Sequence, residues 1–217
     1  LNRLQRELQA ALKAHPTLTE AIAFLDRVLG VSSSLTGFAM DNMTRDDGWR
    51  FLIIGRRLER LSFLANSIAG FLRMPSSRGP GSLEWLLELS DSIITYRSRY
   101  SRLPELLPVL DLLVFDDSNP HGVIFQASVL TRYLDRMARE LDEKYESDLP
   151  DVLRRLRAFD LEAFEHQQFS QCRVCSPCEE LAALLKELDT AANQLSAWLG
   201  MRYFTHVGDV SRQTMAL

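Results

Sequence analysis

The chain has 217 residues, of which 46% are hydrophobic and 25% are charged, as in an ordinary globular domain. Its 25 basic and 29 acidic residues leave a net charge of −4, which argues against a dedicated nucleic-acid-binding protein. No secretion signal is apparent, and no apolar run approaches the roughly 20 residues that span a bilayer. We therefore expect a cytoplasmic protein that binds neither nucleic acid nor membrane.

Apolar residues recur with helical spacing along almost the whole chain, and no segment alternates in the way a strand does. The connections between the helical segments are short. We therefore expect an all-α fold, mainly an antiparallel bundle of about eight helices in a single domain covering residues 1–217, with a flexible tail at 207–217. The expected helices cover roughly residues 4–14, 17–30, 33–43, 46–72, 82–101, 119–141, 151–165 and 176–203.

Several helix ends have recognisable signals in the sequence. Thr17 followed by Glu20 predicts a capping box, and Gly30 predicts the end of that helix. Thr44 resembles a cap for the central helix. Asn119 and Pro120 predict a helix that begins there, with Asn at the N-cap and Pro in the first helical position.

The central helix, 46–72, carries the most informative pattern. Its apolar residues point in every direction, which predicts a helix buried on all sides. It nevertheless contains Arg56, Glu59 and Arg60, and buried charges cost several kcal/mol unless they are paired.

Two explanations of these charges stay open. One is an anion or carboxylate site organised by arginines, with Glu59 orienting them or acting as a base. The other is a structural network of ion pairs, in which Arg60→Ala should lower stability by about 3–5 kcal/mol because it strands a buried partner. Residues 45–102 contain ten Arg, no Lys and six acidic residues, and arginine suits bidentate contacts with carboxylate or phosphate.

Two other clusters could carry chemistry. Glu84, Glu88 and Asp91 share one face of the helix expected at 82–101, either as a solvated surface or as partners of the arginine cluster. The segment 116–122, DDSNPHG, could hold a cation or ligand, although capping and turn formation account for most of it, and His121 is a weak candidate.

The three cysteines form a Cys-x-x-Cys-x-x-Cys pattern made of Cys172, Cys175 and Cys178. Thiolates at this spacing can bind zinc or an iron–sulfur cluster. Three thiols leave a tetrahedral site one ligand short, and His166 is the only candidate nearby. Incidental cysteines in a polar loop are the alternative, so we expect no metal and no cofactor.

Four blocks of sequence resemble the bacterial alpha-E family, an all-helical domain named for a helix with a Glu-Arg motif. The blocks are MTRDDGWRFLIIGRRLER (43–60), LLELSDSIITYRSRY (86–100), VLDLLVFDDSNP (109–120) with Phe125 and Gln126, and YFTH (203–206). The chain departs from the family in having His121-Gly122 where Arg-Ser is usual, which weakens any anion-binding role there. It also lacks an earlier Glu-Arg helix, so it resembles the later part of a longer unit.

The resemblance implies a role in bacterial peptide synthesis or modification, with ATP-grasp ligases, transglutaminase-like proteins and a peptidase as partners. The motif residues carried over are Glu59 and Arg60, with companions Arg56, Trp49, Thr95, Arg97, Asn119, Gln126 and His206. Our hypothesis is a non-catalytic helper or substrate-binding module in which Arg56 and Arg60 hold an anionic peptide or a phosphate. In this hypothesis Glu59 orients the two arginines, and Gln126 and His206 supply hydrogen bonds. The alternatives are an enzyme of acyl or amide chemistry with Glu59 or His206 as general base, and a purely structural domain.

Overall fold

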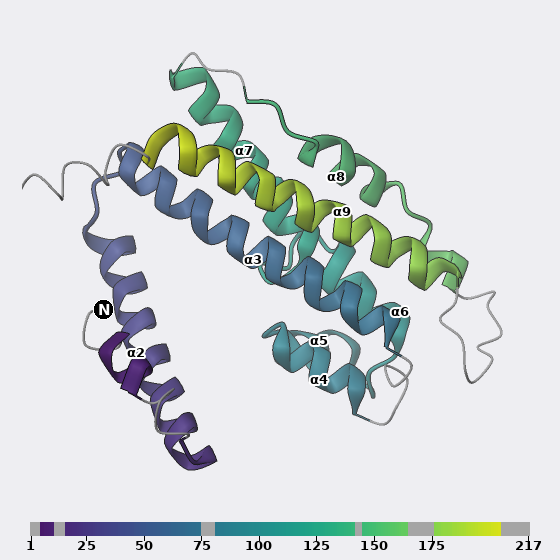
Figure 1. Cartoon of the computed structure of the whole chain (residues 1–217). Helices are drawn as coiled ribbons and strands as arrows, with labels where there is room; N and C mark the ends of the chain where they lie inside the picture. The colour runs from purple at the N-terminus through teal and green to yellow at the C-terminus, as the bar shows by residue number, and fades with distance from the viewer. Residues whose placement is uncertain (1–4, 11–15, 75–80, 142–144, 165–175, 205–217) are drawn as a thin grey trace, which may run out of the picture. The chain divides into compact units, whose positions relative to one another are not determined.

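The computed structural model describes residues 5–10, 16–74, 81–141, 145–164 and 176–204 (Figure 1). Helices make up most of these residues, and none of them lies in a strand. The prediction of an all-α fold is confirmed. The chain divides into two compact units, Leu1–Arg50 and Phe51–Leu217, which are described separately.

The N-terminal unit is built around α2 (Leu18–Asn42). Thr17 and Glu20 form the predicted capping box: the Glu20 amide donates to Thr17 Oγ1, and the Thr17 amide donates to Glu20 Oε2 at 2.8 Å. The predicted break after Gly30 is wrong, and the two expected helices are one. Gly30 does not adopt the left-handed conformation that ends a helix, so the chain continues through it at a modest entropic cost.

Because α2 is continuous, its apolar residues belong to one long helix. Because the expected break divided the segment, no long apolar helix was predicted from sequence. Within the described residues, α2 is the one helix long and apolar enough to cross a membrane on length and composition alone. None of its most apolar 18-residue window is buried in the structure.

The long helix α3 (Asp47–Arg73) matches the central helix predicted from sequence to within one residue at each end. Its N-terminus is capped by Asp46, whose Oδ1 accepts from the Trp49 amide at 3.1 Å. Thr44, the expected cap, lies two residues too early for this contact. From Phe51 onward, α3 belongs to the second unit.

In the second unit, α3 packs antiparallel to α9 (Ser176–Leu199) (Figure 1). Polar contacts join the two helices: Ser62 Oγ donates to Asp189 Oδ1, and Lys186 Nζ donates to Asn66 Oδ1 at 2.7 Å. The other elements are α4 (Ser82–Leu89), α5 (Ile93–Tyr100), α6 (Leu106–Leu110), a π-helical turn (Asp111–Phe115), α7 (Val123–Leu141), α8 (Leu149–Arg157), a 3-10 turn (Leu161–Phe164) and a closing π-helical turn (Gly200–Phe204).

One continuous apolar core fills the second unit. Its fully buried side chains come from almost every helix and include Leu61, Ile68, Leu86, Leu110, Leu130, Leu134, Leu181 and Leu185. Burying a leucine side chain contributes about 2 kcal/mol, so this core is the main source of stability.

Other helix boundaries also differ from the predictions. The helix expected at 82–101 is interrupted between α4 and α5, by the turn 90–92. The helix expected from Asn119 begins at Val123, because residues 119–122 form a turn closed by the Gly122 amide and the Asn119 carbonyl at 2.9 Å. The helix expected at 151–165 covers Leu149–Arg157 and is followed by a separate 3-10 turn, where Asp160 Oδ1 accepts from the Glu162 amide at 3.0 Å.

Candidate functional site

The Glu-Arg motif lies on the exposed side of α3. The buried side of the helix carries Ile54, Leu58, Leu61, Ala65 and Ile68 at helical spacing. Glu59 and Arg60 are both exposed. The prediction of a helix buried on all sides is therefore wrong, and the loss of 3–5 kcal/mol expected for Arg60→Ala under the structural hypothesis no longer has a physical basis.

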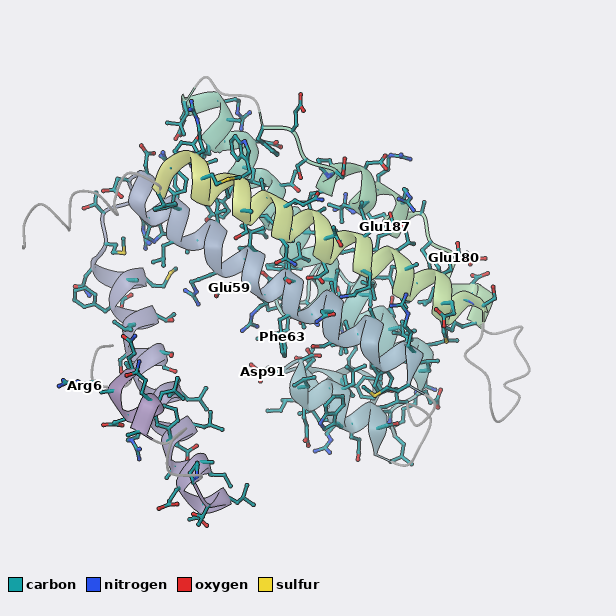
Figure 2. All side chains as sticks on the ribbon, viewed as in Figure 1. Arg6, Glu59, Phe63, Asp91, Glu180 and Glu187 are labelled. Carbon is teal, nitrogen blue, oxygen red and sulfur yellow. The ribbon has the colours of Figure 1, made fainter. Side chains whose placement is uncertain are left out.

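Two of the apolar residues that suggested burial are themselves exposed. Leu52 is 36% exposed and Phe63 is 50% exposed. They lie on the same side of α3 as Arg56 and Glu59, at spacings of three and four residues. Figure 2 shows Glu59 and Phe63 on α3 and Asp91 near them.

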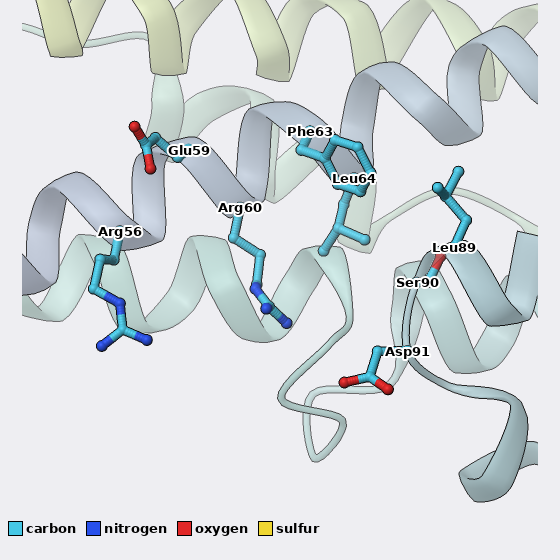
Figure 3. Close-up of a pocket in the computed structure, with 8 residues that line it drawn as sticks. All are labelled: Arg56, Glu59, Arg60, Phe63, Leu64, Leu89, Ser90 and Asp91. Carbon is cyan, nitrogen blue, oxygen red and sulfur yellow. The ribbon is translucent and has the colours of Figure 1, made fainter. Parts of the chain in front are cut away.

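An open pocket of about 340 Å³ lies beside the Glu-Arg motif. Its lining comes from one stretch of α3 and from the end of α4 with the turn that follows (Figure 3). The lining residues are Arg56, Glu59, Arg60, Phe63, Leu64, Leu89, Ser90 and Asp91. The pocket thus combines two guanidinium groups, two carboxylates and a partly exposed apolar wall.

The two arginines of this pocket differ in their contacts. Arg56 forms no hydrogen bond or ion pair with any other residue that the structure describes. Arg60 Nη1 lies 2.6 Å from His121 Nδ1. Since arginine can only donate, His121 Nδ1 accepts this hydrogen bond, and the neutral ring carries its proton on Nε2.

His121 links Arg60 to the acidic turn after α4. Its Nε2 lies 3.8 Å from Asp91 Oδ2. Burial and the nearby Arg60 charge lower the pKa of His121, and Asp91 partly offsets this. At neutral pH the ring is therefore uncharged, as its acceptor contact with Arg60 requires.

Glu59 does not orient either arginine in this structure. Its carboxylate is turned away from the guanidinium groups of Arg56 and Arg60 (Figure 3). It has no hydrogen-bond or ion-pair partner in the described part of the chain. Arg56 and Glu59 are three residues apart on α3, but they form no ion pair among the described contacts.

Asp91 has an uncommon backbone conformation that ends α4. Its φ of 53° is in the left-handed region, which glycine usually occupies at this position of a helix end. The Asp91 amide donates to the Glu88 carbonyl at 3.0 Å, and the Ser92 amide donates to the Leu87 carbonyl at 2.8 Å. This pair of bonds is a Schellman motif, and it brings the Asp91 side chain to the pocket.

A second polar cluster lies on the adjacent side of α3. Arg57 Nη1 donates to Gln126 Oε1 at 2.9 Å, and Gln126 Nε2 donates to the Pro120 carbonyl. Gln126 is fully buried, and the Arg57 guanidinium also lies 5.6 Å from the centre of the Phe125 ring. Burial is the main cause that lowers the pKa of Arg57, with the Arg56 and Arg60 charges contributing.

Asn119 supports the turn 119–122 with its buried side chain. Its side chain is 2% exposed, its Nδ2 donates to the Leu112 carbonyl at 2.9 Å, and its Oδ1 accepts from the His121 amide at 3.0 Å. Asn119 therefore shapes the turn that presents His121 to Arg60. It is a structural residue rather than a helix N-cap.

The other residues predicted from sequence lie elsewhere. Arg97 pairs loosely with Glu84, at 3.8 Å, and neither it nor Thr95 lines the pocket. Trp49 belongs to the N-terminal unit, where the Arg45 guanidinium lies 4.4 Å from its ring centre. His206 lies outside the described residues. Of the three acids expected to share one face, only Asp91 lines the pocket with Arg56 and Arg60.

The cysteine pattern cannot be assembled from the described residues. Cys172 and Cys175, like His166, lie outside them. Cys178 is 3% exposed and packs in the apolar core. No group of three or more potential metal ligands occurs among the residues that the structure describes.

Two residues were undervalued at the sequence level. His121 was a weak candidate, and Arg57 was only one of the ten arginines counted in residues 45–102. Each of them contacts a segment far away in sequence. Arg57 and Arg60 are three residues apart, so they share one face of α3 and reach the same turn. That spacing was the available signal.

A larger hollow, of about 610 Å³, lies between α8 and α9 and is less suited to an ionic ligand. Its three basic residues are already paired: Arg155 with Glu187, Lys186 with Asp189, and Arg73 with Glu179. The pocket beside the Glu-Arg motif has an unpaired arginine among its described residues, so it is the better candidate site.

Comparison with known proteins identifies relatives of this chain. It is 26% identical over 182 residues to the uncharacterised proteins Rv2567 of Mycobacterium tuberculosis and Mb2597 of Mycobacterium bovis. These matches cover 75% of this chain but only 20% of each relative, so the chain spans about a fifth of their length. No solved structure matches it significantly. Residues 1–204 match the family described as a predicted alpha-helical domain with a conserved ER motif, and the chain therefore belongs to the Alpha-E family.

Proposed function

We propose that this chain is a non-catalytic module that binds an anionic group of a peptide in a bacterial system that forms or modifies peptide bonds. The observation that carries the proposal is the Arg56 guanidinium, which lines an open pocket without a partner among the described residues. A guanidinium offers five N–H donors in a planar fork that matches a carboxylate or phosphate.

The neighbouring arginines have different roles in this proposal. Arg57 holds the turn 119–122 through Gln126 and is structural. Arg60 is positioned by His121 and keeps further donors for a ligand. Arg56 is the group that a ligand can engage without breaking a contact of the described residues. Gln126 supports the site indirectly and does not contact a ligand, because its oxygen and its nitrogen are both engaged within the protein.

The pocket favours binding over catalysis. Ser90 is its only hydroxyl among the lining residues, and this side chain is 4% exposed and donates to the Leu86 carbonyl at 2.8 Å. The ring nitrogen of His121 that could serve as a base accepts from Arg60. A nucleophile needs an adjacent base to activate it, and the described contacts of Ser90 and His121 pair neither of them in that way.

The proposed partners are an ATP-grasp ligase and transglutaminase-like or peptidase proteins, in keeping with the family resemblance. A purified ligase of this class, encoded in the same organism, should form its product faster on a peptide substrate when this chain is added. The Arg56→Leu variant of this chain should not give that increase, so the ligase should form its product at the rate it shows without the chain.

Anion binding itself can be tested directly on the whole chain. Acetate and inorganic phosphate would be titrated at constant ionic strength while the Nε–Hε NMR signals of arginine are followed. We expect the Arg56 and Arg60 signals to shift, and the shifts to vanish in Arg56→Leu. Arg139→Leu is the matched control, since Arg139 is exposed on α7 and also has no ion-pair partner among the described residues. Equal responses in both variants would contradict the proposal.

A further inference from the structure

We propose that the anionic group bound in this pocket is the C-terminal carboxylate of a peptide whose last side chain is apolar. This inference rests on the proposed function and narrows it to one class of ligand. It follows from three properties of the lining: an apolar wall, a particular balance of charge, and an opening to solvent.

The apolar wall is formed by Phe63, Leu64 and Leu89. Phe63 is 50% exposed and Leu89 is 37% exposed, and both line the same pocket as the two arginines. Figure 3 shows these side chains at one end of the pocket and Arg56 at the other. A ligand that fills the pocket therefore needs an apolar group joined to an anion. Free phosphate does not supply this combination, nor does an acidic side chain within a peptide.

The charge of the lining favours a carboxylate over a phosphate. Arg56 and Arg60 are opposed by Asp91, whose side chain is 85% exposed at the pocket. A dianionic phosphate would be repelled by that carboxylate. A peptide C-terminus carries one negative charge and also an amide N–H, which Asp91 can accept as a hydrogen bond. The arginines and Asp91 thus match the carboxylate and the N–H of the same terminal residue.

The size and shape of the pocket fit a chain end. Its volume of about 340 Å³ is near the lower end of the range of about 300–1,000 Å³ for ligand sites. That space holds one terminal residue but not a whole peptide. Because the pocket is open, the preceding residues of the peptide can continue into solvent.

The test compares four probes on the whole chain by NMR titration. They are the peptide acetyl-Gly-Gly-Phe with a free C-terminus, the same peptide with a C-terminal amide, acetyl-Gly-Gly-Ala with a free C-terminus, and inorganic phosphate. We expect the free Phe-ended peptide to bind at least tenfold more tightly than its amide and severalfold more tightly than the Ala-ended peptide. Phosphate should bind more weakly than the free Phe-ended peptide.

Variants identify the groups responsible. Phe63→Ala should remove the preference for Phe over Ala at the C-terminus and leave the preference for the free acid over the amide. Arg56→Leu should remove the preference for the free acid. The exposed positions of both residues allow these changes without loss of the core, and the denaturation midpoint of each variant would verify this.

The outcomes separate this inference from the proposed function. Equal binding of acid and amide, or tighter binding of phosphate, would overturn the C-terminal inference while anion or peptide binding survived. Decanoate serves as a fifth probe, and tight binding of decanoate in place of the peptides would also overturn the inference, in favour of a fatty acid. If none of the probes shifted the Arg56 and Arg60 signals, both the inference and the proposed function would fail.

Discussion

Arg56 and Arg57 are adjacent in sequence, yet they belong to two sides of α3 with opposite character. Arg57 lies on the network side, where it donates to the buried Gln126 and thereby holds the turn 119–122. Arg56 lies on the pocket side, where no described residue engages its guanidinium. The rotation of about 100° between successive residues of a helix is enough to separate a structural charge from one available to a ligand.

For these two arginines, the presence or absence of a partner within the protein, rather than the residue type, decides which one can bind a ligand. A half-buried arginine with a buried amide partner stabilises the fold it contacts. An exposed arginine with no partner contributes little to stability and can be kept for binding. The Glu-Arg motif adjoins both sides, because Arg60 contacts the turn through His121 and also lines the pocket.

The largest effect should follow from Gln126→Ala on the network side. This change removes the acceptor of Arg57 and the donor to the Pro120 carbonyl, and it leaves a void at a fully buried position. We expect the free energy of unfolding to fall by about 2–4 kcal/mol. Urea denaturation measures this, with Gln194→Ala as control, since Gln194 is exposed on α9 and should change stability by less than about 0.5 kcal/mol. Equal losses of stability in the two variants would show that the buried contacts of Gln126 do not stabilise the fold.

The paired variants Arg57→Leu and Arg56→Leu compare the two sides directly. Arg57→Leu leaves Gln126 Oε1 buried without its donor and should cost about 1–3 kcal/mol. Arg56→Leu should change stability by less than about 0.5 kcal/mol but abolish anion binding. Chemical denaturation and the titrations described above are the two measurements. If Arg56→Leu were the more destabilising variant, Arg56 would have to be assigned to the structural network.

A smaller effect should appear in the dependence of stability on pH. The pKa of His121 is lowered in the folded protein, mainly by burial and then by Arg60, so the unfolded chain binds the proton more tightly. The stability that neutral His121 provides is therefore complete above its unfolded pKa of about 6.5 and is lost as the pH falls through the lower folded value. Protonation also removes the acceptor of Arg60 and places two positive charges side by side.

The variant His121→Gln isolates this contribution from the other groups that titrate in acid. Asp91 also faces His121, and its charge opposes the downward shift of the pKa. We expect the thermal midpoint of the wild type to fall more steeply between pH 7 and pH 5 than that of the variant. Parallel curves for the two proteins would show that the contact between Arg60 and His121 carries no linked stability.

The fold was predictable from local pattern because helical periodicity is a local property. The bounds of α3 were predicted to within one residue, and the capping box of Thr17 was predicted from two residues. The interruption between α4 and α5 was not predictable, because Asp91 takes a left-handed conformation without a glycine or proline to mark it. The continuity of α2 was missed because Gly30 predicted the end of a helix, whereas it is an ordinary helical residue.

The candidate site was only partly predictable. Arg56, Glu59 and Arg60 were identified from the central helix, and the pocket contains all three. Their burial was predicted wrongly, because apolar residues on every side of α3 do not show which sides are covered; Phe63 remains half exposed. The contact of Arg60 with His121 joins residues 61 positions apart, and only the packing of the turn 119–122 against α3 brings them together.

The smallest change in stability, and the sharpest separation of fold from function, should come from Asp91→Gly. Glycine adopts the left-handed conformation of this residue without a steric cost, which offsets its greater freedom in the unfolded chain. We expect the free energy of unfolding to rise by roughly 0.5 kcal/mol, while binding of the free Phe-ended peptide weakens because the acceptor for its N–H is gone. Asp91→Asn is the matched control: asparagine tolerates the same backbone conformation and keeps a carbonyl oxygen that can accept the N–H, so it should leave stability nearly unchanged and weaken binding less than glycine does. Loss of stability in the glycine variant would mean that the carboxylate serves the fold through His121 more than it serves a ligand. A residue kept in a conformation that glycine would adopt more readily is then best explained by what its side chain does at the pocket.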